Sequence, residues 1–96
     1  MKIKIRILRG PLTKIVGKSE FSVQSKKQVR VIDVLRLLAK KYGKPFRDYV
    51  FDPKKGVVNS YLMFALNGVN VSCIKGTETQ IEDGSELLIL SATGGG

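Results

Sequence analysis

The stretch of sequence that decides the expected fold is residues 86–96, which read ELLILSATGGG. The apolar run 87–90 predicts a strand in the middle of a sheet, covered on both faces, because it offers no polar position to turn towards water. The segment after it, 91–96, carries small side chains or none. At about 3.3 Å per residue it could extend roughly 20 Å, which is far enough to enter a cleft in another protein.

The three terminal glycines allow two interpretations. Because glycine lacks a Cβ, residues 94–96 would form a ribbon thin enough to thread a narrow channel, with the terminal carboxylate leading. The other interpretation is a disordered end or a remnant of cloning. The choice between them depends on the rest of the chain.

The size and composition of the chain exclude several classes of protein. Its 96 residues are enough for one domain with a single core, in which a deep catalytic cleft would be unusual. No apolar run approaches the ~20 residues of a membrane span, and Met1 leads into an alternating segment rather than a secretory signal. We therefore expect a protein that has no membrane partner.

The single cysteine, Cys73, limits the redox chemistry of the chain. One cysteine cannot form an internal disulfide or, by itself, a metal site, so a reducing cytoplasm is the simplest location. A ferredoxin-type cluster is excluded because it needs four cysteine ligands. We expect Cys73 to be a buried, small apolar residue rather than a sulfur donor.

The net charge of +9 is unevenly placed along the sequence. Residues 1–55 hold 16 of the 17 lysines and arginines and four acids, whereas residues 56–96 hold Lys75 and four acids. A basic surface can steer a protein to nucleic acid or to an acidic partner, and it can also serve solubility alone. An alternative function is therefore a small nucleic-acid-binding module, whose affinity would fall steeply with salt. Its candidate contacts are Lys2, Lys4, Arg6, Lys26, Lys27, Lys40 and Lys41.

Two sequence features argue against nucleotide or nucleic-acid binding. Tyr61 and Phe64 would point to opposite faces of one strand, so they do not form the aromatic platform usual in single-strand binding. The segment 17–19 (GKS) lacks the first glycine and the following helix of a phosphate loop. We therefore rank nucleic acid below a protein partner.

The first half of the chain predicts a hairpin followed by one helix. Cations and isoleucines alternate over residues 2–7, which indicates a first strand, and residues 20–24 indicate a second strand after a long connection. A helix is expected over 31–42, where Gly43 is placed for a left-handed cap and Pro45 prevents resumption. Residues 46–52 are ambiguous between a turn and a short helix. The apolar stripe of the helix consists of Val31, Val34, Leu35, Leu38 and Tyr42.

The second half predicts a third strand, 61–66, and a tight return through Asn67-Gly68, because both of these residues tolerate positive φ. Residues 69–71 return along it, and 81–84 turn into the last strand at Glu86. Apolar residues occupy both faces of 61–66, so the second face is either a partner surface or is buried by another element. Leu62, Phe64 and Leu66 share one face, and the candidate partner surface is Tyr61, Met63 and Ala65.

The order strand, strand, helix, strand, short strand, strand predicts an α+β fold. We expect a mixed sheet of about five strands with one main helix on one face. The last strand should lie in the middle, parallel to the first, because crossovers are right-handed and doubly apolar strands are central. This is a β-grasp arrangement over residues 1–90, with 91–96 as a flexible C-terminal tail.

The combination of Asn67-Gly68, residues 81–87 (IEDGSEL) and the glycine-rich end resembles the ubiquitin-like sulfur carriers. These include the small subunit of molybdopterin synthase, the thiamine sulfur carrier and the ubiquitin-related modifier. The terminal glycine pair of the family falls on Gly95 and Gly96, and Ser91-Ala92 is similar to the Ser-Thr of the modifier branch. The chain departs from the family pattern at Ser85, in its third glycine and in its high positive charge.

The resemblance implies a carrier or modifier rather than an enzyme. Gly96, with Gly95, would present the reactive carboxylate on a spacer made of Gly94, Thr93, Ala92 and Ser91. That carboxylate is anionic at neutral pH and is a poor electrophile, so an E1-like activating enzyme would use ATP to form an acyl-adenylate. Attack by sulfur would then give a thiocarboxylate, and attack by lysine an isopeptide bond. The resemblance implies no catalytic residue, bound cofactor or metal in this chain, and it leaves molybdopterin, tRNA thiolation and protein lysines open as destinations.

Overall fold

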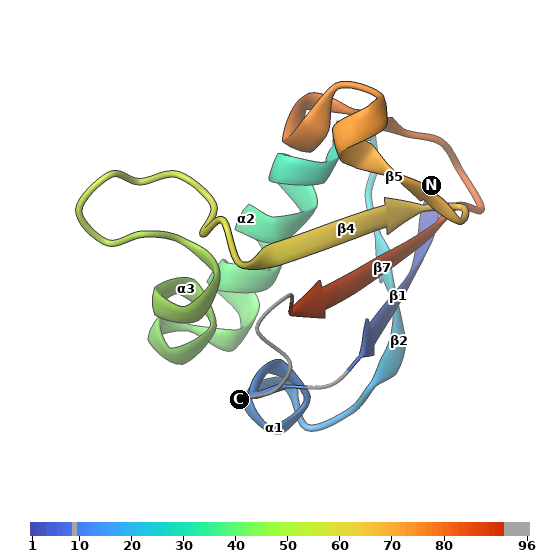
Figure 1. Ribbon diagram of the computed structural model, residues 1–96. Coiled ribbons are helices and arrows are strands. Elements are labelled where there is room, and N and C mark those ends of the chain that lie inside the picture. Colours follow the sequence, from blue (N-terminus) through green and yellow to red (C-terminus); the bar gives the residue numbers. More distant parts are fainter. Residues whose placement is uncertain (9, 92–96) are drawn as a thin grey trace.

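The computed structural model describes residues 1–8 and 10–91, and in this part of the chain a five-stranded sheet packs against three helices (Figure 1). The sheet order is β2-β1-β7-β4-β5, and β3 and β6 form a separate two-stranded ladder. The elements are β1 (Lys2–Leu8), α1 (Leu12–Val16), β2 (Glu20–Gln24), β3 (Val29–Arg30), α2 (Val31–Tyr42), α3 (Lys44–Val50), β4 (Leu62–Leu66), β5 (Val69–Asn70), η1 (Val71–Cys73), η2 (Gly76–Glu78), β6 (Gln80–Ile81) and β7 (Glu86–Ser91).

The central position of β7 confirms the predicted topology. β7 runs parallel to β1, with Leu87 opposite Ile5, and antiparallel to β4, with Leu87 opposite Leu66. β1 and β2 form the antiparallel hairpin, and Asn67 and Gly68 turn β4 into β5 with φ values of 51° and 85°. The fold is therefore the expected β-grasp arrangement.

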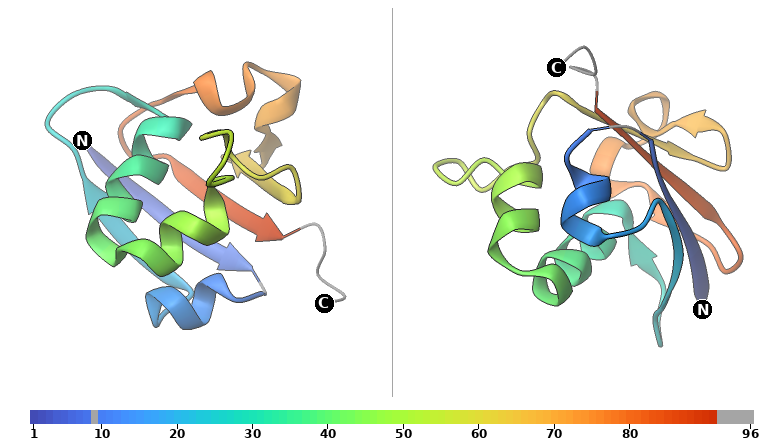
Figure 2. Two further views of the ribbon diagram at one scale, coloured as in Figure 1. Left: turned by 90° about the vertical axis from the view of Figure 1, so that its left-hand side faces the viewer. Right: turned by 90° about the horizontal axis from the view of Figure 1, so that it is seen from below.

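Helix α2 has the predicted bounds and covers one face of the sheet (Figure 2). Its first turn is fixed by Asp33, which accepts hydrogen bonds from the Arg30 backbone N–H (2.9 Å), Nε (3.0 Å) and Nη2 (3.1 Å). These bonds lower the pKa of Asp33 to about 2. The other terminal nitrogen of Arg30, Nη1, reaches Glu78 Oε1 at 2.6 Å. Arg30 therefore ties the start of α2 to η2.

The end of α2 differs from the expected left-handed cap. Gly43 has a positive φ of 82° but an extended ψ of −159°, and its N–H donates to the Ala39 carbonyl. The reason is that α3 begins at the next residue, Lys44, with Pro45 in its first turn. Phe46 and Val50 of α3 are fully buried, so the ambiguous segment is a core helix.

The long connection between β1 and β2 contains α1, which the sequence did not predict. Leu12 and Val16 are the buried residues of this short helix, and Gly17 closes it in the left-handed conformation. Gly17 therefore belongs to a helix cap and not to a phosphate loop.

The two faces of the sheet have different surroundings. Leu87 and Ile89 of β7 are buried against the helices, whereas Leu88 and Leu90 point to the other face and are only half-buried. The expectation that the run 87–90 is covered on both faces is wrong, because α1, α2 and α3 lie on the same side of the sheet (Figure 2). The outer face of the sheet is open.

Cys73 lies in η1 and is exposed, which corrects the expectation that it is buried. In η1 it is the neighbouring Val71, and not the cysteine, that is turned into the core. Within the described part of the chain, no helix has the length and hydrophobicity needed to cross a membrane.

Candidate functional site: the open sheet face and the base of the tail

The outer face of the sheet carries an apolar surface next to the end of β7. The register places Leu90 between Leu8 of β1 and Met63 of β4, and places Leu88 beside Ala65. Leu8 and Met63 are 38% and 41% exposed. A shallow hollow in this surface is lined by Met63, Phe64, Ala65, Asn70, Leu88 and Leu90. We call Leu8, Met63, Ala65, Leu88 and Leu90 the outer apolar face.

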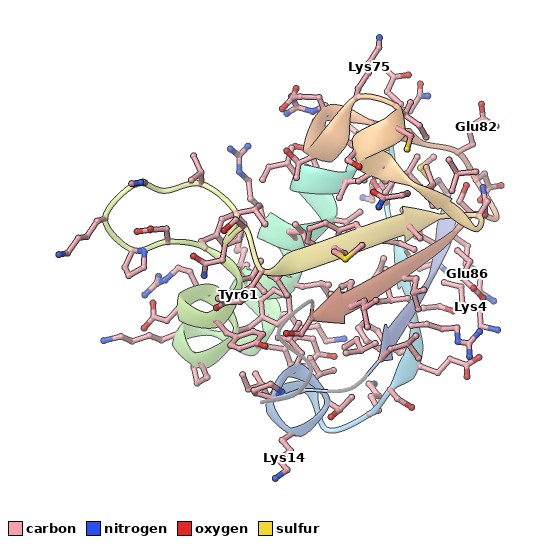
Figure 3. All side chains as sticks on the ribbon, viewed as in Figure 1. Lys4, Lys14, Tyr61, Lys75, Glu82 and Glu86 are labelled. Atoms are coloured by element: carbon pink, nitrogen blue, oxygen red, sulfur yellow. The ribbon has the colours of Figure 1, made fainter. Side chains whose placement is uncertain are left out.

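A band of paired charges borders the outer apolar face at the end of the sheet remote from Ser91. Lys4 Nζ lies 2.7 Å from Glu20 Oε1 and 3.8 Å from Glu86 Oε2, and Arg6 Nη1 lies 3.9 Å from Glu86 Oε1. The pKa of Lys4 is raised, and that of Glu20 lowered, mainly by their mutual hydrogen bond. Lys4 and Glu86 can be followed side by side in Figure 3. The charges on this face largely cancel, so it suits an apolar contact better than a polyanion.

The base of the predicted tail is the end of β7. Ser91 is the last residue of the strand, pairs with Leu62 of β4 and is buried. Tyr49 Oη lies 3.3 Å from Ser91 Oγ, and a Cβ on Gly10 would lie 3.5 Å from Ser91 Cβ. The structure therefore places Ser91, the first residue of the predicted spacer, inside the sheet. Ala92, Thr93, Gly94, Gly95 and Gly96 lie outside the described residues.

Of the three candidate partner-surface residues, Met63 and Ala65 lie on the outer face and Tyr61 does not. Tyr61 precedes β4 and packs on α3, with its ring centroid 5.4 Å from that of Tyr49. Its hydroxyl donates to the Tyr49 carbonyl at 2.6 Å and accepts from Asn59 Nδ2 at 3.1 Å. Burial raises the pKa of Tyr61. Figure 3 shows Tyr61 beside α3, at the start of β4.

Sequence reasoning missed Leu8, Leu88 and Leu90 as members of the outer apolar face. The signal was available, because the same alternation that divides β4 into two faces also divides β7. The candidate nucleic-acid contacts do not form one surface. Lys2, Lys4 and Arg6 lie on the outer face, and Lys40 lies at the end of α2 on the helical side. Lys26, Lys27 and Lys41 line two hollows beside β2. Among residues 1–8 and 10–91, no group of three His, Cys, Asp or Glu residues is arranged to hold a metal ion.

Comparison with known proteins identifies the family. The model of the ThiS family matches residues 7–96, whereas no curated protein matches the chain. The solution structure of small archaeal modifier protein 1 from Methanosarcina acetivorans is 27% identical, with a TM-score of 0.80 over 99% of this chain and 96% of that one.

Two more distant structures share the fold. Urm1 from Trypanosoma brucei is 16% identical, with a TM-score of 0.72 over 99% of this chain and 95% of that one. The structure of the BexX/CysO complex from Amycolatopsis orientalis is 21% identical, with a TM-score of 0.71 over 98% of this chain and 99% of that one. The chain thus belongs to the ThiS family, within the ubiquitin-like sulfur carriers and modifiers of β-grasp fold.

Proposed function

We propose that this protein is a ubiquitin-like modifier, a sulfur carrier, or both, acting through the α-carboxylate of Gly96. The observation that carries the proposal is the position of Ser91. It ends the central strand beside the uncovered outer apolar face, and the sequence that follows it is ATGGG. An activating enzyme needs a docking surface on the folded body of such a substrate and access to its terminal carboxylate.

The proposed chemistry takes place in a partner enzyme. A carboxylate oxygen of Gly96 attacks the α-phosphate of ATP and displaces pyrophosphate, which leaves an acyl-adenylate. Hydrosulfide then displaces AMP and loses its proton to give a thiocarboxylate, or a lysine amine displaces AMP, loses a proton and forms an isopeptide bond. This chain supplies the electrophile, and Gly95 and Gly94 have no Cβ that would obstruct the nucleophile. ATP is bound and used by the activating enzyme.

The outer apolar face is the surface that we assign to the activating enzyme. Exposed apolar side chains on a sheet face mark interaction sites when they are contiguous, and Leu8, Leu90 and Met63 are neighbours in the register. The charge pairs of Lys4 and Glu86 at its border would fix the orientation of docking more than they add affinity. CysO, a structural neighbour, is known in complex with a protein partner, BexX.

The decisive experiment uses the purified full-length protein, its activating enzyme and ATP. We expect pyrophosphate release that depends on the carrier and is lost when Gly95 and Gly96 are deleted. A peptide tag after Gly96 should abolish the reaction, and the same tag before Met1 serves as the matched control. Unchanged adenylation after the deletion would overturn the proposal. Intact-mass analysis of protein from its native cells should show oxygen replaced by sulfur, or larger conjugates.

We place the protein in the cytoplasm, because an exposed Cys73 thiol suits a reducing compartment. The alternative of a nucleic-acid-binding module gains no support from the geometry. Lys4 and Arg6 are engaged by Glu20 and Glu86, and of the remaining candidate cations Lys2 alone shares their face of the sheet.

A further inference from the structure

The edge of the sheet at β2 offers unpaired backbone groups. Within the described ranges, β1 is the one strand that pairs with β2. Beyond its two ends, the Ile7 N–H donates to the Ser19 carbonyl, and the Ser25 N–H donates to the Met1 carbonyl. In an antiparallel pair, alternate residues direct their backbone N–H and C=O groups towards the partner strand. Ser19 and Ser25 bond to β1 or its end, so the odd-numbered residues of β2 face β1 and the even-numbered residues direct their backbone groups outward. These residues are Glu20, Ser22 and Gln24.

A groove runs beside this edge, between β2 and α2. One part of it, a hollow of about 320 Å³, is bounded by Ser22, Val23, Gln24, Leu37, Leu38 and Lys41. A second hollow follows the loop from Ser25 to Arg30 and shares Leu37 with the first. Leu37 is 43% exposed, whereas its neighbour Leu38 on the same helix is buried in the core. The groove therefore has an apolar contact at the point where its two parts meet.

The charge of the groove is positive. Lys41 lines one part, and Lys26 and Lys27 line the other. The carboxylate in the lining, Asp33, is already held by the guanidinium of Arg30. An extended segment lying in the groove would therefore meet lysines at both of its ends.

We propose that this groove binds an extended acidic segment of a partner protein, which adds as a strand to β2. Its backbone would pair with the outward groups of β2, an apolar side chain would contact Leu37, and carboxylates would lie beside Lys26, Lys27 and Lys41. RNA would use the lysines but leave the backbone edge and Leu37 without a role. A second copy of this chain would bring the same lysines together, which disfavours pairing through this edge.

The groove and Ser91, the last described residue, lie at different ends of β1, so the groove and the outer apolar face can be occupied at once. The Lys26 and Lys27 part adjoins Met1, at the start of β1, because the Ser25 N–H bonds to the Met1 carbonyl. Ser91 lies beyond Leu90, which is opposite Leu8 at the other end of β1. A partner held at β2 would leave the outer apolar face accessible to an activating enzyme.

The test uses full-length, ¹⁵N-labelled protein and a synthetic peptide of two glutamates, four valines and two glutamates. We expect saturable amide chemical-shift changes at Glu20–Gln24, Lys26, Lys27 and Leu37. N-methylation of alternate peptide amides should lower the affinity at least tenfold relative to the unmodified peptide. Leu37→Ser and the pair Lys26→Glu and Lys27→Glu should each weaken binding at least tenfold. The matched controls are Val57→Ser, at an exposed apolar position, and the pair Lys54→Glu and Lys55→Glu, and they should change affinity less than twofold.

Four results would overturn the proposal. In the NMR titration, these are the absence of saturable shifts and shifts that fall on Met63 and Leu88 instead. The third is an equal affinity for a single-stranded RNA oligonucleotide of the same charge. The fourth is a dimer, seen by light scattering, that Leu37→Ser dissociates. Because the assay contains neither ATP nor an activating enzyme, its failure would leave the reaction at Gly96 unaffected, and failure of adenylation would leave the groove unaffected.

Discussion

Met63 and Phe64 are neighbours that point to opposite faces of β4. Replacing Phe64 should therefore reduce stability, whereas replacing Met63 should weaken docking and leave stability nearly unchanged. Phe64 is 5% exposed in the core, and Met63 is 41% exposed on the outer apolar face. Truncating a buried phenylalanine costs about 3–5 kcal/mol, from lost transfer free energy and the cavity that remains. A domain of this size has about 5–15 kcal/mol in total, so Phe64→Ala should leave it marginal. Met63→Glu should change the free energy of unfolding by about 0.5 kcal/mol or less.

The two variants should separate again in the adenylation assay. Met63→Glu places a carboxylate where the activating enzyme would bury an apolar surface, so the KM for the carrier should rise at least about tenfold, equivalent to about 1.4 kcal/mol of docking free energy. Phe64→Ala, measured at a temperature where it is folded, should retain the wild-type KM. Urea unfolding followed by circular dichroism gives the stabilities. A Met63→Glu variant that unfolds, or that keeps its KM, would refute the assignment of an open docking face.

Three further predictions concern stability and reactivity. Because folding lowers the pKa of Asp33, its carboxylate stabilises the fold at pH values above its ordinary pKa of 3.8, and this contribution is lost as the pH falls towards 2. In urea titrations, Asp33→Asn should therefore cost about 1 kcal/mol at pH 7 and little at pH 2. Asn67→Gly keeps the positive φ but loses the side-chain hydrogen bonds to the Glu86 N–H (2.9 Å) and to Ser85 Oγ (3.2 Å). The free energy of unfolding, measured by chemical denaturation, should fall by about 1–2 kcal/mol. A fall below about 0.3 kcal/mol would show that these bonds are dispensable. Cys73 should react with one equivalent of a thiol reagent in the native state, and slow reaction that needs denaturant would contradict its exposure.

Elements with a long or strict pattern were predictable from the sequence. Alternation over residues 2–7 gave the two faces of β1, although the strand extends to Leu8, and the apolar stripe of α2 gave its face and bounds. Asn67-Gly68 gave the return of β4 into β5. Short elements were not predictable. Five residues of α1 hold too little of a helical period to be recognised, and β3 and β6 are two residues each and are fixed by each other across the chain.

The errors about the candidate site have one physical cause. A run such as 87–90 shows that neither face is polar, but not whether anything covers each face, because coverage depends on where the helices pack. Here the helices lie on one side, and Leu88 and Leu90 remain half-buried. The same limit applies to Tyr61, whose apolar ring gave no sign that α3 would provide its partner, Tyr49.

Folding redistributes the uneven charge of the sequence over the surface of the protein. Acids from the second half fold back on particular cations of the first: Glu86 on Lys4 and Arg6, and Glu78 on Arg30. The outer face is thereby nearly neutral, and the cations of the helical side and of the β2 edge keep the excess of +9. Because like-charged surfaces repel, this arrangement disfavours self-association through the helical side while leaving the apolar face accessible. One small domain can therefore bind two partners of different chemistry, an apolar one on its outer face and an acidic one at its β2 edge.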